Sequence, residues 1–477
     1  MKRSIELRMA VVAAVLVFAF AISGLAQESG PRSPIVVSES AQSRPPRVPS
    51  APGTLFIPKS SQPQTPPAGH KFAAHTNVEI LIPHGLNPDE APPFPGYGYE
   101  TPASLACHYG LVAAGANIPN CNPNSTTAVP TGGSKTIAIV DAYVDPSAPG
   151  DLAWFSLQFG IPLSLSQFQV VWANTANSSC SYSGVPVDYS GGWEVEEALD
   201  IEWAHAMAPK ANIYLVEACS NLDSDLQQAI LVANNLVQCG QSEIAGDLTL
   251  GTCPANSTGK GEVSMSWGGV EWGGEAANDA CAYLDDSCFK TPNVVYFAAS
   301  GDSPGVSWPG TSPNVVSAGG TTIRRNASTF NFIQEAAWVY GSGGVSYVES
   351  KPGYQSIPNL SGTTGRAVPD FSFDADPYTG VYVYDTFPID YEYYWYEWLI
   401  VGGTSVSSPA LAGIVNSAGH FAASTNAELT LAYSNRGVAA DFTDITHGFC
   451  GNYMGYSTTA GWDFCTGIGV VSSYAGK

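Results

Sequence analysis

The feature that most constrains the fold of this chain is an alternation of short apolar runs with helical segments, which begins at residue 136. The apolar runs have the length of buried strands, and the intervening segments are long enough for helices. This alternation is typical of a mostly parallel sheet with helices on both faces. We therefore expect an α/β fold, with strands at residues 136–140, 168–172, 212–216, 263–267, 293–299 and 314–318 and helices at residues 194–207, 223–236 and 408–420.

Residues 1–26 have the pattern of an export signal. Positive charges precede an apolar run over residues 9–22, and small residues follow it. The run is shorter than the ~20 residues that a membrane-spanning helix needs, although an uncleaved anchor stays an alternative. We expect a secreted, extracellular protein without stable membrane association.

The next segment, residues 27–96, is rich in Pro and Ser. Such a composition indicates an extended leader or a short pro-segment. One apolar stretch within it, residues 78–82, has the pattern of a strand. From residue 97 to residue 477 the composition is that of a globular domain.

The charge of the chain limits its partners. The formal net charge is −23, with 41 acidic against 18 basic residues. This excess argues against nucleic acid, because binding phosphates requires Lys and Arg, and against anionic membranes. A strongly acidic chain carries little self-repulsion in an acidic medium. Simple solubility is an equally good explanation of the charge.

Ten cysteines together with an export signal indicate disulfides. There is no CxxC pair, which argues against a zinc site. Spacing does not fix the connectivity, but short-range pairs are reasonable, for example Cys107–Cys121, Cys281–Cys288 and Cys450–Cys465.

The sharpest local signal is the run Gly-Gly-Thr-Ser-Val-Ser-Ser-Pro at residues 402–409. Two glycines permit a close backbone approach, and Pro409 suits a first helical turn. Ser405 would then lie at a helix N-terminus, where backbone N–H groups can face developing negative charge. The run resembles the serine segment of subtilisins and predicts a nucleophile, although a glycine-rich loop with a serine cap is the alternative.

A serine nucleophile needs a base, and the histidines do not provide an obvious one. None lies in the His-Gly-Thr context of subtilisins, and His205 reads as an ordinary helix residue. The base is therefore expected to be another kind of side chain. The histidines are His70, His75, His84, His108, His205, His420 and His447.

The predicted helix over residues 194–207 supplies carboxylates. Glu196 and Asp200 are four residues apart and share a face. Two neighbouring carboxylates repel each other when both are charged, and this repulsion raises the effective pKa of one of them. A carboxylate can then act as a base at acidic pH, where a histidine is protonated. A solvated acidic face is the alternative, and we assign Glu194, Glu197 and Glu202 to it.

A third acid, Asp302, directly follows the predicted strand at residues 293–299. Loops at the carboxyl ends of strands hold the sites of open α/β sheets. Asp302 could cap a turn. Alternatively, a protonated Asp302 carboxyl could donate a hydrogen bond to a tetrahedral oxyanion.

These three segments, in this order, resemble the sedolisin family of serine-carboxyl peptidases, which includes the kumamolisins and a tripeptidyl peptidase. The resemblance runs from about residue 101 to the C-terminus. It also includes Ser-Trp-Gly-Gly at 266–269, Ser-Trp-Pro-Gly at 307–310, residues 315–322 and Asp-Ala-Asp-Pro at 374–377.

The resemblance implies a subtilisin-like fold and a secreted, acid-acting endopeptidase, a hydrolase that forms an acyl-enzyme on Ser405. It implies Glu196 as the general base, supported by Asp200, and Asp302 as the oxyanion stabiliser. Trp267 matches a tryptophan that lines the family's active site. Asp141 falls where some members have a glutamate that extends the carboxylate network.

The C-terminal part resembles the family's site for one Ca²⁺ ion. The implied ligands are the side chains of Asp444 and Asp463 and the carbonyls of Ile445, Thr459 and Gly461. Calcium takes oxygen ligands of both kinds. A turn with two Asp residues is the alternative.

Other points stay open. The leader is shorter than the family's propeptide domain, and residues 390–398 form either a substrate-facing loop or a packing hairpin. We expect protein or peptide substrates and a monomer, with endopeptidase against tripeptidyl-peptidase action undecided. The alternative function is a non-catalytic, calcium-binding surface protein that keeps the peptidase fold.

Overall fold

The computed structural model describes residues 53–87, 90–113, 119–174, 177–180, 184–239, 259–276, 281, 284–389, 397–452 and 455–477. These residues all belong to one unit of the chain, residues 37–477. The expected export signal and residues 390–396 of the aromatic segment lie outside the described residues.

The main sheet has the strand order β17-β18-β14-β10-β9-β7-β4-β6-β5, with β11 pairing to β10. The pairings from β5 through β18 are parallel, whereas β11 and β17 add antiparallel edges. The expected mostly parallel sheet is therefore confirmed. Its strands are β4 (Thr136–Ala142), β5 (Phe168–Trp172), β6 (Asn212–Ala218), β7 (Gly261–Met265), β9 (Val294–Ala299), β10 (Val316–Arg325), β11 (Phe332–Ala337), β14 (Phe371–Asp374), β17 (Phe442–Thr443) and β18 (Val470–Val471).

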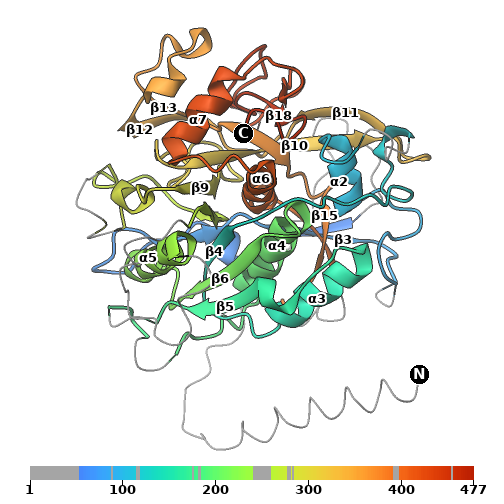
Figure 1. The fold of residues 1–477 in the computed structure, drawn as a ribbon, viewed down its shortest axis with the longest axis horizontal. Helices are drawn as coiled ribbons and strands as arrows, with labels where there is room; N and C mark the ends of the chain where they lie inside the picture. The colour runs from blue at the N-terminus through green and yellow to red at the C-terminus, as the bar shows by residue number, and fades with distance from the viewer. Residues whose placement is uncertain are drawn as a thin grey trace, which may run out of the picture. The chain divides into compact units, whose positions relative to one another are not determined.

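Helices cover both faces of this sheet, as Figure 1 shows. In β4, Ile137 and Ile139 pack into a core shared with α3, α4 and α6. The alternate residues Ala138 and Val140 pack with α5 on the other face. Successive side chains of a strand point to opposite faces, so β4 is buried on both. The helices are α2 (Pro102–His108), α3 (Ala148–Phe159), α4 (Gly192–Met207), α5 (Asp223–Cys239), α6 (Thr404–Ala418) and α7 (Thr425–Ser434).

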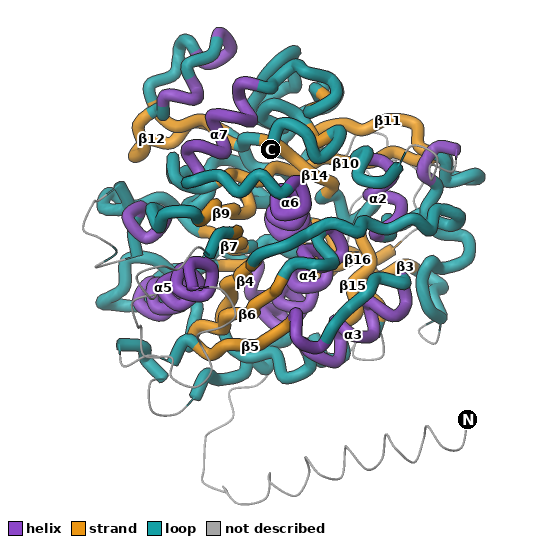
Figure 2. The backbone as a smooth tube through the Cα atoms, in the orientation of Figure 1, coloured by secondary structure: helices purple, strands orange, loops and turns teal. Residues whose placement is uncertain are grey.

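A second, antiparallel sheet has the order β1-β3-β16-β15 (Figure 2). It joins the leader, through β1 (Gly53–Phe56) and β3 (Glu79–Pro83), to β16 (Trp398–Gly402), the strand directly before Ser405. The expected strand at 78–82 is confirmed within one residue. The remaining strands are β2 (His75–Thr76), β8 (Trp267–Gly268), β12 (Gly344–Ser350), β13 (Gly365–Val368) and β15 (Val381–Tyr384).

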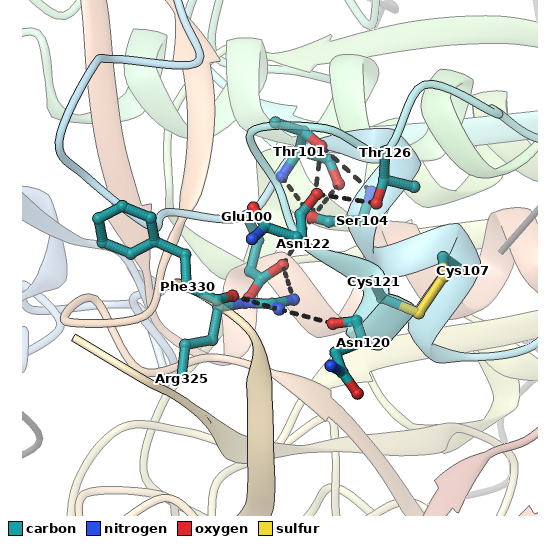
Figure 3. The surroundings of a disulfide bond; sticks show 10 residues. All are labelled: Glu100, Thr101, Ser104, Cys107, Asn120, Cys121, Asn122, Thr126, Arg325 and Phe330. Carbon is teal, nitrogen blue, oxygen red and sulfur yellow. Dashed lines mark hydrogen bonds and ion pairs between the residues drawn. A yellow bond between two sulfur atoms is a disulfide. The ribbon is translucent and has the colours of Figure 1, made fainter. Parts of the chain in front are cut away.

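The start of the globular domain is fixed to the sheet by an ion pair and a disulfide (Figure 3). Arg325, at the end of β10, donates through Nε and Nη2 to both carboxylate oxygens of Glu100, at 2.5 and 2.7 Å. Its Nη1 also donates to the carbonyl of Asn120, next to the disulfide Cys107–Cys121. A planar guanidinium that binds a carboxylate through two bonds gives a geometrically specific link.

The three short-range disulfides expected from the sequence are all present. A further disulfide joins Cys180 to Cys219, at the end of β6. Within the described residues, no helix has the length and apolar character required to cross a membrane.

The prediction for Pro409 is wrong in one respect. Helix α6 begins at Thr404 rather than at residue 408, so Pro409 lies in its second turn. The helix starts early because Gly403 has φ +105°, which ends β16 and turns the chain directly into the helix. Ser405 therefore lies in the first turn of α6.

Candidate active site

Ser405 is fully buried at the N-terminus of α6. Its Oγ donates to the carbonyl of Ser266 at 3.0 Å and accepts the backbone N–H of Asn77 at 3.1 Å. Its own backbone N–H donates to the carbonyl oxygen of Asn77 at 3.2 Å. Asn77, a residue of the leader, therefore contacts both the hydroxyl and the backbone N–H of this serine.

Gly403 leaves room for that carbonyl oxygen. A Cβ on Gly403 would lie 2.0 Å from the Asn77 oxygen and 2.6 Å from Oδ2 of Asp302. The absent side chain thus creates a small space that the carbonyl oxygen fills, beside both the carboxyl of Asp302 and the N–H of Ser405. Such a pair of donors has the geometry of an oxyanion hole.

Asp302 follows β9 directly, as the sequence predicts. Its Oδ1 accepts two hydrogen bonds from Thr404, from the backbone N–H at 2.8 Å and from the hydroxyl at 2.7 Å. Its buried Oδ2 has no hydrogen-bond partner. Burial raises the pKa of Asp302 to about 7, although the bonds from Thr404 oppose the shift. Because Oδ1 already accepts two donors, a proton on this carboxyl belongs on Oδ2.

Glu196 and Asp200 lie on α4, which packs against α6. Both are fully buried. Burial raises the pKa of Glu196 well above its usual value, and the charge of Asp141 adds to the shift. Neither oxygen of Glu196 has hydrogen-bond geometry to a partner. The Ser405 hydroxyl and the Asn77 N–H are nevertheless close enough to favour its charged form and oppose the shift.

Ser266 connects Asp200 to the nucleophile. Its hydroxyl lies 2.7 Å from Oδ1 of Asp200 and 3.2 Å from the carbonyl oxygen of Ser405. That carbonyl lacks its helical partner, because Pro409, four residues later, has no N–H to donate. A single hydroxyl proton serves one acceptor at a time, so protonated Asp200 can donate to Ser266 while Ser266 donates to Ser405.

Asp141 and Trp267 also border the site. Asp141 lies in β4, is fully buried and has no partner for either carboxylate oxygen. Burial raises its pKa to about 8, and its charge in turn raises the pKa of Glu196 and Asp200. Trp267 is fully buried, and its indole N–H donates to the carbonyl of Val140 at 2.7 Å.

The assignment of Glu194, Glu197 and Glu202 to a solvated helix face is wrong. Every residue of α4 is buried, because the helix is covered by α6 and α3 as well as by both sheets. Burial raises the pKa of each of the three carboxyls, to about 9 for Glu194. Burial therefore favours a neutral rather than a charged acid at these positions.

The histidines all lie within the described residues, and none bonds to Ser405. Some of the rings bond to acidic side chains, for example His70 to Asp223 and His108 to Glu335. His205 is a fully buried residue of α4 whose two ring nitrogens have no partner. The expectation that the base is not a histidine therefore agrees with the geometry.

The residues expected at the calcium site come together. Gly461 N–H donates to Oδ2 of Asp444 at 2.8 Å, and Thr459 N–H donates to Oδ2 of Asp463 at 3.1 Å. Oδ1 of Asp444 is buried without a partner. Among the described residues, no three His, Cys, Asp or Glu side chains form a group suited to a metal. The oxygen-rich donor set fits calcium, but backbone carbonyls, including that of Ile445, would have to complete it.

Sequence reasoning missed Asn77, Ser266, Gly403 and Thr404 as parts of this site. Three of them stand within the motifs at 266–269 and 402–409, so their place next to the candidate nucleophile was a usable signal. Asn77 lies 328 residues from Ser405, in the leader, and gives no local signal.

Comparisons with known proteins find similarity to peptidases. No family model matches. Sedolisin of Pseudomonas sp. (strain 101) is 27% identical over 365 residues, 72% of this chain and 57% of that protein. Kumamolisin of Bacillus sp. (strain MN-32) is 30% identical over 347 residues, 65% of this chain and 54% of that protein. The chain thus spans little more than half the length of these relatives.

A solved structure shares the fold. Pseudomonas sedolisin, described as a serine-carboxyl proteinase complexed with two molecules of pseudo-iodotyrostatin, aligns with a TM-score of 0.56 and 23% identity. The alignment covers 78% of this chain and 95% of that one. The subtilisin-like α/β fold is thereby confirmed. The two homologues confirm the resemblance to the sedolisin family that the motifs carry.

Proposed function

We propose that the protein is a secreted serine-carboxyl endopeptidase that hydrolyses peptide bonds at acidic pH through an acyl-enzyme on Ser405. One observation carries the proposal. A peptide carbonyl oxygen, that of Asn77, accepts the N–H of Ser405 and lies beside the unpartnered Oδ2 of Asp302. These contacts support the proposal, because a substrate carbonyl would need the same two neighbours.

In the acylation step Glu196 takes the proton of the Ser405 hydroxyl as this oxygen attacks the substrate carbonyl. The negative charge that develops on the carbonyl oxygen is stabilised by the Ser405 N–H and by protonated Asp302. Glu196 then gives the proton to the leaving amine, and later activates the water that hydrolyses the ester. The raised pKa of Glu196 makes its carboxylate a stronger base than an exposed glutamate.

Asp200 positions the groups around Ser405 and does not itself react with the substrate. It is bound to Ser266, which in turn contacts the carbonyl of Ser405, so Asp200 links α4 to the first turn of α6. Asp141 extends the buried carboxyl cluster. Such a cluster titrates as a unit, and its apparent pKa values belong to the group. Activity requires Glu196 charged while Asp302 is neutral, so the rate falls as the pH rises through about 7, the pKa of Asp302.

Calcium binding belongs to the same proposal. Asp444 and Asp463 would hold the ion with their carboxylates, and Ile445, Thr459 and Gly461 with their carbonyls. The unpartnered Oδ1 of Asp444 supports this assignment. A bound ion would crosslink residues 444–445 to residues 459–463, which lie in the loop closed by the disulfide Cys450–Cys465, and would stabilise the fold.

The experiment compares variants on a denatured protein substrate at about pH 4, where carboxylates titrate. Ser405→Ala, Glu196→Gln and Asp302→Ala are each expected to lose about 10²-fold or more in kcat. Glu202→Gln is the matched control, because Glu202 is a buried acid on the same helix whose side chain binds the N–H of Tyr384. Unchanged turnover in a site variant would refute the role given to that residue.

A further inference from the structure

Residues 70–74 of the leader lie between two walls that lead away from the candidate nucleophile. One wall continues from β8, which pairs antiparallel with β2 and has Gly268 opposite His75. The other wall is the loop between β6 and α5. There the N–H of Ala74 donates to the carbonyl of Asn221 at 2.8 Å, and the Asn221 side-chain amide donates to the carbonyl of Ala74 at 2.7 Å. The two walls hold an extended peptide by its backbone, as many peptide-binding sites do, and we call the space between them the groove.

The groove contains an aromatic slot that holds the side chain of Phe72. Its ring meets the ring of Trp308 edge to face, with centroids 5.2 Å apart, and lies 6.2 Å from the ring of Trp267. Gly269 leaves room for it, because a Cβ on Gly269 would lie 2.6 Å from Cε2 of Phe72. Gly269 and Trp308 also donate their backbone N–H groups to each other's carbonyls, at 2.9 and 3.0 Å. The slot is therefore fixed by backbone pairing and has the size of one flat ring.

Beyond the slot, the groove has an acidic and an aromatic side chain that face basic residues. Asp223, the first residue of α5, donates its N–H to the carbonyl of Phe72 at 3.2 Å. Its carboxylate accepts the N–H of Lys71 at 2.8 Å and lies 2.6 Å from Nδ1 of His70. The ammonium of Lys71 lies 5.2 Å from the centroid of the Trp272 ring, a distance at which a cation is attracted to an aromatic face. This end of the groove therefore suits basic side chains.

The slot and the basic end lie at fixed distances along the chain from the candidate nucleophile. The carbonyl oxygen of Asn77 accepts the N–H of Ser405, so Asn77 occupies the position of the residue before a scissile bond. Counted back from Asn77 as the first residue, Phe72 is the sixth. Lys71 and His70 are then the seventh and the eighth. A substrate must therefore be extended over eight residues to reach every contact of the groove.

We propose that the groove selects the substrates of this enzyme, and that it favours proteins in which the sixth residue before the scissile bond is aromatic and the seventh and eighth are basic. The proposal rests on the proposed peptidase function and names the class of its substrates. An added substrate reaches Ser405 only in molecules whose groove is not occupied by residues 70–77, so the slot and the Asp223 carboxylate are then free to bind it. The aromatic ring should contribute most, because it buries a large apolar area, whereas an exposed charge pair contributes little.

The experiment uses the full-length protein at about pH 4. It first digests denatured proteins, and mass spectrometry identifies the residues before each cleavage site. A peptide that is cut is then synthesised again with either Phe or Ala as the sixth residue before the cut. We expect kcat/KM to be at least about tenfold higher with Phe, mostly through a lower KM. Moving Phe to the fifth or the seventh position should remove this gain. Replacing Lys by Ala at the seventh or the eighth position should lower kcat/KM about threefold.

Two variants test which residues of the groove make the selection. Gly269→Ala fills the slot, so it should remove the preference for Phe as the sixth residue. It should still cut a shortened peptide, which begins four residues before the cut, as fast as the parent does. Gly273→Ala is the matched control, because no atom lies within 4 Å of a Cβ at Gly273, and it should keep the preference. Asp223→Asn should remove the preference for a basic eighth residue and leave the preference for Phe unchanged.

The outcomes separate this proposal from the function on which it rests. If the parent cuts peptides and Ser405→Ala does not, but Phe and Ala as the sixth residue give equal kcat/KM, the peptidase function stands and the selection by the groove is refuted. A preference for Phe that persists in Gly269→Ala would also overturn the proposal, because it would not come from the slot. The comparison of peptides in the parent decides the question even if Gly269→Ala does not fold. If the parent cuts no protein and no peptide, the peptidase function itself is wrong, and the proposal falls with it.

Discussion

Replacing Glu428 by Gln should make the fold less sensitive to pH. Glu428 lies in α7, far from Ser405 in the sequence, is fully buried, and has no hydrogen-bond partner for either oxygen. Burial raises its pKa from 4.5 to about 7, with Lys477 opposing the shift. Between these two pKa values, Glu428 keeps its proton in the folded state and loses it in the unfolded chain. The contribution of Glu428 to stability is complete below about pH 4.5 and is lost as the pH rises to about 7.

The size of this loss follows from the shift. One pKa unit corresponds to about 1.4 kcal/mol, so Glu428 costs the folded protein about 3 kcal/mol at pH 7 relative to pH 4. Glutamine is close in shape to the protonated acid and does not titrate. Glu428→Gln should therefore match the parent at pH 4 and be more stable by about 3 kcal/mol at pH 7.

Urea unfolding measures this difference, with Ser405→Ala in every chain to prevent self-digestion. Glu90→Gln is the control, because Glu90 is exposed, and its effect should be the same at both pH values. If Glu428→Gln changes the free energy of unfolding equally at pH 4 and pH 7, then Glu428 does not hold a proton in the folded state and the reasoning is wrong.

Three further predictions concern the site and the calcium loops. Gly403→Ala places a Cβ 2.0 Å from the Asn77 oxygen, at φ +105°, so it should lower kcat on a small peptide by at least about 10²-fold, with folding checked by circular dichroism. Ser266→Ala removes the link to Asp200 and should lower kcat about tenfold with little change in KM, which steady-state kinetics would reveal. Asp444→Asn should weaken calcium binding measured by calorimetry and abolish the drop in melting temperature that a chelator causes in the parent; equal calcium affinity in both proteins would contradict the assigned site.

The parts of the site that the sequence predicted are those with a local signature. Asp302 was identified because a loop follows an apolar strand, and Ser405 because glycines and a proline surround it. The strands of the main sheet were predicted for a similar reason, since buried strands are apolar throughout. In each case the chemistry of neighbouring residues determines the local structure.

The parts that were missed depend on contacts between distant segments. The spacing of acids on α4 shows which residues share a face but not what covers that face, so Glu194 and Glu202 were assigned to solvent although both are buried. Asn77 stands in a segment whose composition indicates a linker. The pairings of β3 with β16 and of β2 with β8 bring it to Ser405. Neither fact could be read from residues close in sequence.

The buried setting also changes the reason for proposing a carboxylate as the base. The sequence argument held that a histidine would be protonated in acid. Burial lowers the pKa of His205, on the same helix as Glu196, to about 4, so an imidazole at this depth would be neutral at pH 5. The charge state of a buried imidazole would therefore not prevent it from acting as a base. The proposed role of Glu196 therefore rests on its position, because Glu196, and not His205, lies close to the Ser405 hydroxyl. The proposed acidic working range would then come chiefly from Asp302, which can donate to an oxyanion only while it is protonated.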